Sequence, residues 1–158
     1  MEMDQSRINE DITLDRFLSL RGYVPIQLQK TVVGHFEVHV IINGKKARFL
    51  IDTGASNTTI DHKSASEYTL SVEDSNEAAS GLGTSTQPVS TCTIDTLDIG
   101  SLRLKKFNGF VMDLSHVNQA LTENGAQEVN GILGADILTD LNAIIDYRSI
   151  VIYFKENE

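Results

Sequence analysis

The strongest constraint on the fold is a stretch of alternating side chains in the first half of the chain. Apolar residues occupy every second position over 36–42, and the alternation resumes over 47–51. A period of two is typical of half-buried β-strands. The intervening Asn43-Gly44 is typical of a two-residue hairpin turn. The sequence therefore predicts a β-hairpin whose second strand leads directly into Asp52.

Further short strand-like runs follow this hairpin. We expect strands over 89–97, 102–106 and 110–114, and a closing hairpin over 143–154 with its turn at 146–149. Ile99-Gly100-Ser101 is expected to be a turn, and Asn108-Gly109 either a turn or a bulge. This many short strands favour a closed barrel or a sandwich.

Helices are expected to be few and short. Leu14, Phe17 and Leu18 have helical spacing, with Thr13 as the candidate N-cap and Gly22 as the stop. A second short helix is expected over about 135–141. Two polar segments complete the prediction: a surface excursion with a helical turn over 61–79, and a polar connection over 115–130.

The length and charge of the chain restrict its organisation and its partners. A chain of 158 residues predicts one domain. We expect residues 34–158 to form it and residues 1–33 to be a helical extension, serving as a removable prosegment, a dimerisation arm or a plug in a cleft. Lys and Arg number 13 against 22 Asp and Glu, a net charge of −9. Binding to nucleic acid or to an anionic membrane requires concentrated positive charge, so neither partner is expected.

No metal site, cofactor or disulfide is expected. Cys92 is the single cysteine of the sequence, which fits a reducing compartment. It lies in a strand-like run and is expected to be a packed or edge thiol. His35 and His39 are four residues apart, but a strand does not present such a pair as helical ligands do.

The sequence contains no recognisable targeting or membrane-spanning segment. Residues 1–10 are polar and acidic and lack the basic and apolar regions of a signal peptide. No stretch reaches the about 18 apolar residues of a transmembrane helix. We therefore expect a cytoplasmic location.

One ordered set of motifs carries residues suited to chemistry. The apolar run 49–51 is followed by Asp52-Thr53-Gly54 and then by Ala55-Ser56. Gly81-Leu82-Gly83 follows about thirty residues later, and Ile132-Leu133-Gly134 about fifty residues after that. Asp and Gly also dominate ordinary turns, so Asp52 alone would be a weak signal. The order and context of the three motifs are more specific.

These motifs resemble the retropepsin-like aspartic proteases, the single-lobe relatives of pepsin, over about residues 34–156. The resemblance implies a mainly β fold with a closed retropepsin-like acid-protease barrel, one short helix near the C-terminus and an N-terminal helical extension. Asp52 matches the catalytic carboxylate, with Thr53, Gly54, Ala55 and Gly134 as supporting residues. Gly81, Leu82 and Gly83 match the flap that covers the substrate, and Ile132 is expected to line the cleft. Asp136 is expected to be a structural cap or turn residue.

A single Asp-Thr-Gly supplies only half of the expected chemistry. Hydrolysis by carboxylates requires one ionised group and one neutral group, and the two must lie side by side. A symmetric homodimer places Asp52 beside its own copy. The sequence therefore predicts an aspartic endopeptidase that acts as a homodimer on peptide or protein substrates.

Two alternatives remain open at this point. The first is a dimeric peptide-binding or regulatory module that keeps the fold without turnover. The second is a monomeric β-barrel in which Asp52 is a turn residue.

Overall fold

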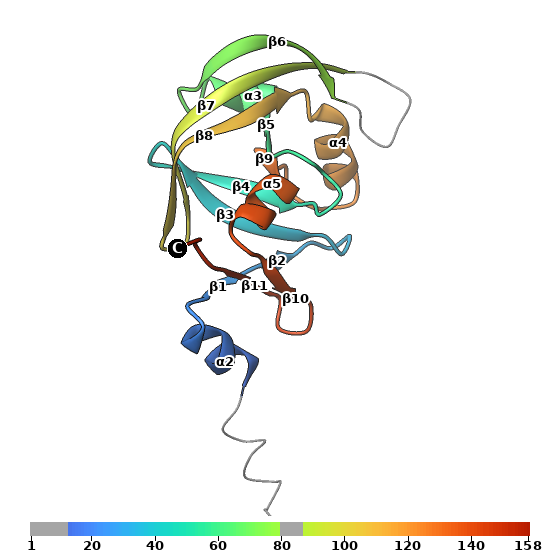
Figure 1. Ribbon diagram of the computed structural model, residues 1–158. Helices are drawn as coiled ribbons and strands as arrows, with labels where there is room; N and C mark the ends of the chain where they lie inside the picture. The colour runs from blue at the N-terminus through green and yellow to red at the C-terminus, as the bar shows by residue number, and fades with distance from the viewer. Residues whose placement is uncertain (1–12, 80–86) are drawn as a thin grey trace, which may run out of the picture.

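The computed structural model describes residues 13–79 and 87–158, which form a barrel with a small sheet beneath it (Figure 1). The large sheet has the strand order β2-β3-β4-β9-β5-β8-β7-β6. Its members are β2 (Gln29–Lys30), β3 (Phe36–Ile42), β4 (Lys45–Ile51), β5 (Thr59–Asp61), β6 (Ser71–Ala79), β7 (Gln87–Ile99), β8 (Leu102–Met112) and β9 (Gly131–Leu133).

The barrel closes because β3 pairs with β7 as well as with β4. The closing contacts join Ile41 to Asp98 and Ile42 to Leu97. Strands β3, β4, β9, β5, β8 and β7 thus form a ring, with β2 and β6 attached outside it. This arrangement confirms the predicted closed β-barrel.

The predicted first hairpin is confirmed in detail. Strands β3 and β4 pair antiparallel from Glu37 with Leu50 to Ile42 with Lys45. Asn43 has φ 50° and Gly44 has φ 82°. Positive φ at both central positions is the requirement of a type I′ turn, whose twist matches that of the flanking strands.

The small sheet contains β1 (Val24–Gln27), β10 (Ile144–Asp146) and β11 (Val151–Phe154), with β11 in the centre. Strands β10 and β11 are the predicted closing hairpin. Strand β1 pairs antiparallel with β11, so part of the N-terminal segment is hydrogen-bonded to the C-terminal strand. The division of the chain at residue 33 remains a prediction.

Helix α2 (Leu14–Leu20) precedes β1 and follows the predicted capping pattern. The backbone N–H of Arg16 donates to Thr13 Oγ1 at 3.1 Å, as expected of an N-cap. The helix stops before Gly22, whose φ is 87°. Leu18 is buried, whereas Leu14 and Phe17 are each 48% exposed.

Strands β7 and β8 form one long bent hairpin. Cys92 and Ile94 are buried in the middle of β7, and Leu97 and Ile99 are buried near its end. The inward-facing positions therefore shift by one residue between Ile94 and Leu97. On β8, Lys106 has φ 50° at the corresponding place. The predicted turn or bulge at Asn108-Gly109 is wrong, because both residues pair in regular register with Thr93 and Cys92.

Two polar segments contain more regular structure than predicted. Part of 61–79 forms α3 (His62–Ala65), but Ser71–Ala79 is the strand β6 rather than a surface excursion. The predicted connection over 115–130 contains the helix α4 (Ser115–Glu123). The predicted short helix after Gly134 is confirmed as α5 (Ala135–Asp140). In the described ranges, no helix is long and apolar enough to cross a membrane.

Among the described residues, the buried apolar side chains form two separate clusters. The main core fills the barrel and continues to the small sheet through residues such as Phe49, Leu133 and Phe154, each 0% exposed. The second cluster is centred on Leu50, Leu121 and Val129. Successive residues of a strand face opposite sides, so Phe49 and Leu50 enter different clusters.

Candidate active site

The candidate site lies where β4 ends and the chain turns toward β5. The ladder between β4 and β9 continues to Asp52, whose N–H donates to the carbonyl of Leu133 at 3.1 Å. The chain then turns, with the N–H of Ala55 donating to the carbonyl of Asp52 at 3.2 Å. The N–H of Gly54 donates to Asp52 Oδ1 at 2.9 Å. This last bond fixes the carboxylate within its own turn.

The loop over 52–58 crosses the end of β9. Strand β9 lies between β4, to which it is parallel, and β5, to which it is antiparallel. A Cβ added to Gly134 would lie 2.7 Å from the carbonyl carbon of Asn57 and 2.8 Å from the carbonyl oxygen of Ala55. Only glycine allows this close passage of backbone over backbone. The N–H of Ala135 donates to that same Ala55 oxygen at 2.7 Å.

Thr58 and Asp136 fasten the far end of the loop. Asp136 Oδ2 accepts from the N–H of Thr58 at 2.9 Å, and Asp136 Oδ1 accepts from Thr58 Oγ1 at 2.7 Å. Thr58 Oγ1 in turn accepts from the N–H of Gly134 at 3.0 Å. Asp136 Oδ1 also accepts from the N–H of Ile137 at 2.8 Å. Both carboxylate oxygens of Asp136 are therefore engaged in holding the loop.

The turn presents its own polar groups to solvent. Asp52, Thr53 and Gly54 are exposed, whereas Thr58 is 0% exposed. A hollow of about 350 Å³ lies beside Thr53. Its other lining residues come from α5 and the start of the small sheet: Ala135, Leu138, Thr139, Asn142, Ala143 and Ile145.

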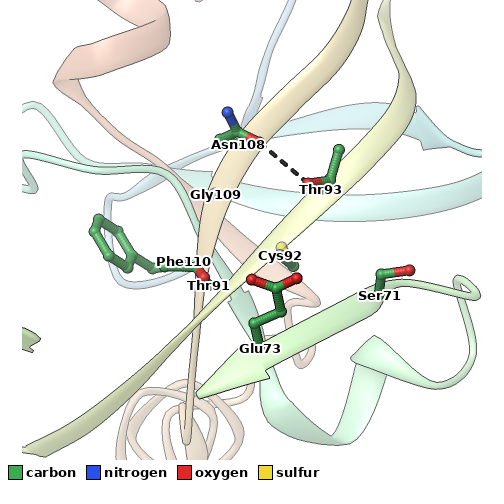
Figure 2. Close-up of a pocket in the computed structure, with 8 residues that line it drawn as sticks. All are labelled: Ser71, Glu73, Thr91, Cys92, Thr93, Asn108, Gly109 and Phe110. Atoms are coloured by element: carbon green, nitrogen blue, oxygen red, sulfur yellow. Dashed lines mark hydrogen bonds between the residues drawn. The ribbon is translucent and has the colours of Figure 1, made fainter. Parts of the chain in front are cut away.

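A second hollow, also of about 350 Å³, lies on β6, β7 and β8 (Figure 2). The side chain of Thr93 on β7 donates to Oδ1 of Asn108, its paired neighbour on β8, at 3.1 Å. The lining residues are Ser71, Glu73, Thr91, Cys92, Thr93, Asn108, Gly109 and Phe110. This set includes none of the residues predicted for the site. Cys92 is buried, as predicted, and burial raises the pKa of its thiol.

A family model for aspartyl proteases matches residues 38–137, which include the whole of this loop, β9 and the start of α5. The chain belongs to the aspartyl protease family. No curated protein matches the sequence.

Two solved structures share the fold of this chain. One is a retropepsin-like aspartic protease from Rickettsia conorii, with 20% identity and a TM-score of 0.53 over 84% of this chain and 90% of that one. Another is the EIAV protease in complex with the inhibitor HBY-793, with 20% identity and a TM-score of 0.55 over 75% of this chain and 98% of that one. These likenesses establish a retropepsin-like fold.

The predicted site residues fall into three groups in this member of the aspartyl protease family. Asp52, Thr53, Gly54, Ala55 and Gly134 come together in one loop and its support, and their roles remain predictions. Ile132 is half-buried on β9 and pairs with Leu50 of β4, and its role in a cleft remains a prediction. The predicted flap residues Gly81, Leu82 and Gly83 lie outside the described residues. Strands β6 and β7, which flank that segment, pair antiparallel.

Sequence reasoning missed two features of the site. Thr58 was not singled out, because a lone threonine before a strand carries no signal of its partner Asp136. Helix α4 was missed although Leu114, Val117 and Leu121 have the spacing of one helical face. In the described parts of the chain, no group of His, Cys, Asp and Glu side chains has the arrangement of a metal site.

Proposed function

We propose that this chain is an aspartic endopeptidase that acts as a homodimer on extended peptides. The observation that carries the proposal is the exposed Asp52, which follows the buried Phe49 and Leu50 of β4 and lies in a turn fixed by backbone hydrogen bonds. Membership of the aspartyl protease family supports the same chemistry.

The reaction requires two carboxyl groups with different protonation states. Two carboxyls about 3 Å apart cannot both ionise, so the pair shares one proton. The ionised group takes a proton from water, which then attacks the peptide carbonyl carbon. The neutral group donates its hydrogen bond to the carbonyl oxygen, and the proton later passes to the leaving nitrogen. The apparent pKa values belong to the pair as a whole.

A second copy of the chain supplies the second carboxyl. The sequence contains one Asp-Thr-Gly, and the carboxylate of Asp136 is already occupied by Thr58 and Ile137. A two-fold axis through the candidate site brings identical residues together, so Asp52 meets the partner's Asp52. Thr53 hydrogen-bonds across this axis in the proposal, and the hollow beside it offers space for the partner.

The substrate is an extended peptide lying over the paired turns. Such a peptide is held by main-chain hydrogen bonds in the manner of an added strand. The role of a flap that closes over the peptide and excludes water falls in this proposal to Gly81, Leu82 and Gly83, which lie outside the described residues. Ile132, which is half-buried beside Leu50, contributes apolar surface to the cleft. No cofactor takes part in the reaction.

The test compares the wild type with Asp52→Asn on a mixed peptide library at several pH values. Asparagine preserves the shape of the side chain but cannot ionise. We expect the wild type to release products and Asp52→Asn to release none above background, with both variants dimeric by sedimentation. Equal cleavage by the two proteins would overturn the proposed mechanism. Peptide binding without products by a dimeric wild type would favour a silent binding module.

A further inference from the structure

The second apolar cluster covers the strand surface next to Asp52. Leu50 and Ile132 are paired neighbours on β4 and β9. Leu50 lies two residues before Asp52, and the ladder continues to Asp52, so the two side chains share one face. Phe49 and Leu133 point into the main core instead. An apolar wall beside the exposed carboxylate would therefore begin with Leu50 and Ile132.

Helix α4 and the segment after it fill the space in front of this wall. Leu121 from α4 and Val129 from the following segment are 3% and 2% exposed, and they pack with Leu50, which is 8% exposed. Ile132 is only partly covered at the edge of the same cluster. Leu121 thus covers Leu50, whereas Ile132 remains partly exposed.

Hydrogen bonds inside the segment hold α4 in this position. Asn118 is 6% exposed, and its side chain donates to the carbonyl of Val129 at 3.1 Å and accepts from the N–H of Val129 at 2.8 Å. The N–H of Ala126 donates to the carbonyl of Leu121 at 2.8 Å, which closes the end of the helix.

Both ends of the segment are also fastened to the barrel. The N–H of Leu114 donates to Asp61 Oδ1 on β5 at 3.1 Å. At the other end, Asn130 exchanges two hydrogen bonds with the backbone of Arg48 on β4, at 2.8 and 2.9 Å. The segment is therefore held against β5 and β4 at its two ends and by the Asn118 hydrogen bonds in between.

We propose that Leu121 is a specificity-determining residue, which fills the apolar pocket in front of Leu50 and so restricts the substrate side chain beside the scissile bond to a small one. This inference rests on the proposed function, because it assigns one wall of that same cleft. A large apolar or aromatic side chain would need the volume that Leu121 occupies. Removing carbons from Leu121 opens that volume while Asp52 and its turn remain intact.

The experiment measures the preference of the protein between two peptides. They are identical except for Ala or Phe at the residue before the scissile bond, and each is made as a cleavable peptide and as a reduced-bond analogue that binds but cannot be cleaved. The proteins are the wild type, Leu121→Ala and the milder Leu121→Val. Leu102→Ala is the control, because Leu102 is also a buried leucine, 8% exposed against 3% for Leu121, but lies in the main core.

We expect the wild type to bind the Ala analogue more tightly than the Phe analogue. In Leu121→Ala the ratio of Phe to Ala affinity should rise about tenfold or more, with a smaller rise in Leu121→Val. Leu102→Ala should lower the melting temperature and leave the ratio within about twofold of wild type. Cleavage, where it occurs, should follow the same ratios.

Failure of this inference can be told apart from failure of the proposed function. Ratios within about twofold of wild type in both folded Leu121 variants would overturn the inference alone. A shifted binding ratio without any cleavage would support the pocket and overturn the hydrolytic function. Absence of binding to either analogue by the wild type would overturn both.

Discussion

Thr58 and Asp136 lie 78 residues apart in the sequence and are joined by two hydrogen bonds, one from the N–H and one from the hydroxyl of Thr58. The threonine hydroxyl also accepts from the N–H of Gly134. The three residues connect the end of the Asp52 loop to β9 and α5. Because all three lie behind the loop, their removal should affect stability before it affects the exposed carboxylate.

Thr58→Val should destabilise the fold by about 1–3 kcal/mol. Valine keeps the shape of the side chain, but the buried N–H of Gly134 loses its acceptor. The free energy of unfolding in urea measures this loss. Thr93→Val is the control, because Thr93 is exposed and its hydroxyl bonds to the side chain of Asn108 rather than to a buried backbone group. A loss no larger than that of the control would show that the network contributes nothing to stability.

Gly134→Ala should destabilise the protein by about 1–3 kcal/mol or more. The new methyl group would lie under 3 Å from backbone atoms of Ala55 and Asn57, which cannot move without displacing the turn. Gly109→Ala is the matched control, because its nearest neighbour, the carbonyl oxygen of Thr58, lies at an ordinary 3.4 Å. Melting temperatures of the two variants give the comparison, and equal shifts would contradict the close crossing of loop and strand.

Asn118→Ala should loosen α4 and cost about 1–3 kcal/mol. Alanine leaves both the N–H and the carbonyl of the buried Val129 without their side-chain partner. Limited proteolysis should then cut the segment around α4 faster than in the wild type. Gln119→Ala, at the neighbouring exposed position, should match the wild type both in its free energy of unfolding and in its rate of proteolysis. Unchanged proteolysis of Asn118→Ala would show that the two hydrogen bonds between Asn118 and Val129 do not hold α4 in place.

Glu37 should make the protein less stable as the pH rises. Its side chain is buried, and among the described residues its Oε1 has no hydrogen-bond partner, while Arg48 Nε lies 3.4 Å from Oε2. Burial raises the pKa of this carboxyl above its usual 4.5, although Arg48 and His39 oppose the shift.

The raised pKa fixes the sign of the pH effect. Between the unfolded and the folded pKa, the native state binds more protons than the unfolded state, so the free energy of unfolding falls as the pH rises through this window. The stability that Glu37 contributes through its raised pKa is fully present below the pKa of the unfolded state and is lost above the pKa of the folded state. Glu37→Gln should flatten the decline of melting temperature above about pH 4.5. If the melting temperatures of the wild type and Glu37→Gln changed in parallel with pH, the raised pKa of Glu37 would be contradicted.

Local patterns in the sequence predicted the framework of the fold. The alternation before Asn43-Gly44 and the closing hairpin depend on neighbouring residues, and both are confirmed. Strand β6 was missed because its sequence does not alternate between apolar and polar residues. It lies outside the barrel ring, at the edge of the sheet. Helix α4 was missed because its polar composition obscured the apolar spacing that ends at Leu121.

The supports of the candidate site could not be predicted from local sequence. The bond between Thr58 and Asp136 exists only because the loop after β4 crosses the end of β9. The same crossing explains why Gly134 must be glycine, a requirement that no turn signal reveals. Asp136 was expected to be a cap or turn residue, but Gly134 is the N-cap of α5, and the carboxylate of Asp136 instead bonds to Thr58, a partner that local sequence does not identify.

The most direct test of the central claim, that two Asp52 carboxyls form one active site, is a subunit-mixing experiment. Wild type and Asp52→Asn are exchanged to equilibrium at constant total subunit concentration, and peptide cleavage is measured as a function of their ratio. In an equal mixture, random pairing leaves about one quarter of the wild-type activity, because only dimers with two intact copies react. A linear decline to about one half would show that each chain acts alone and would contradict the shared site.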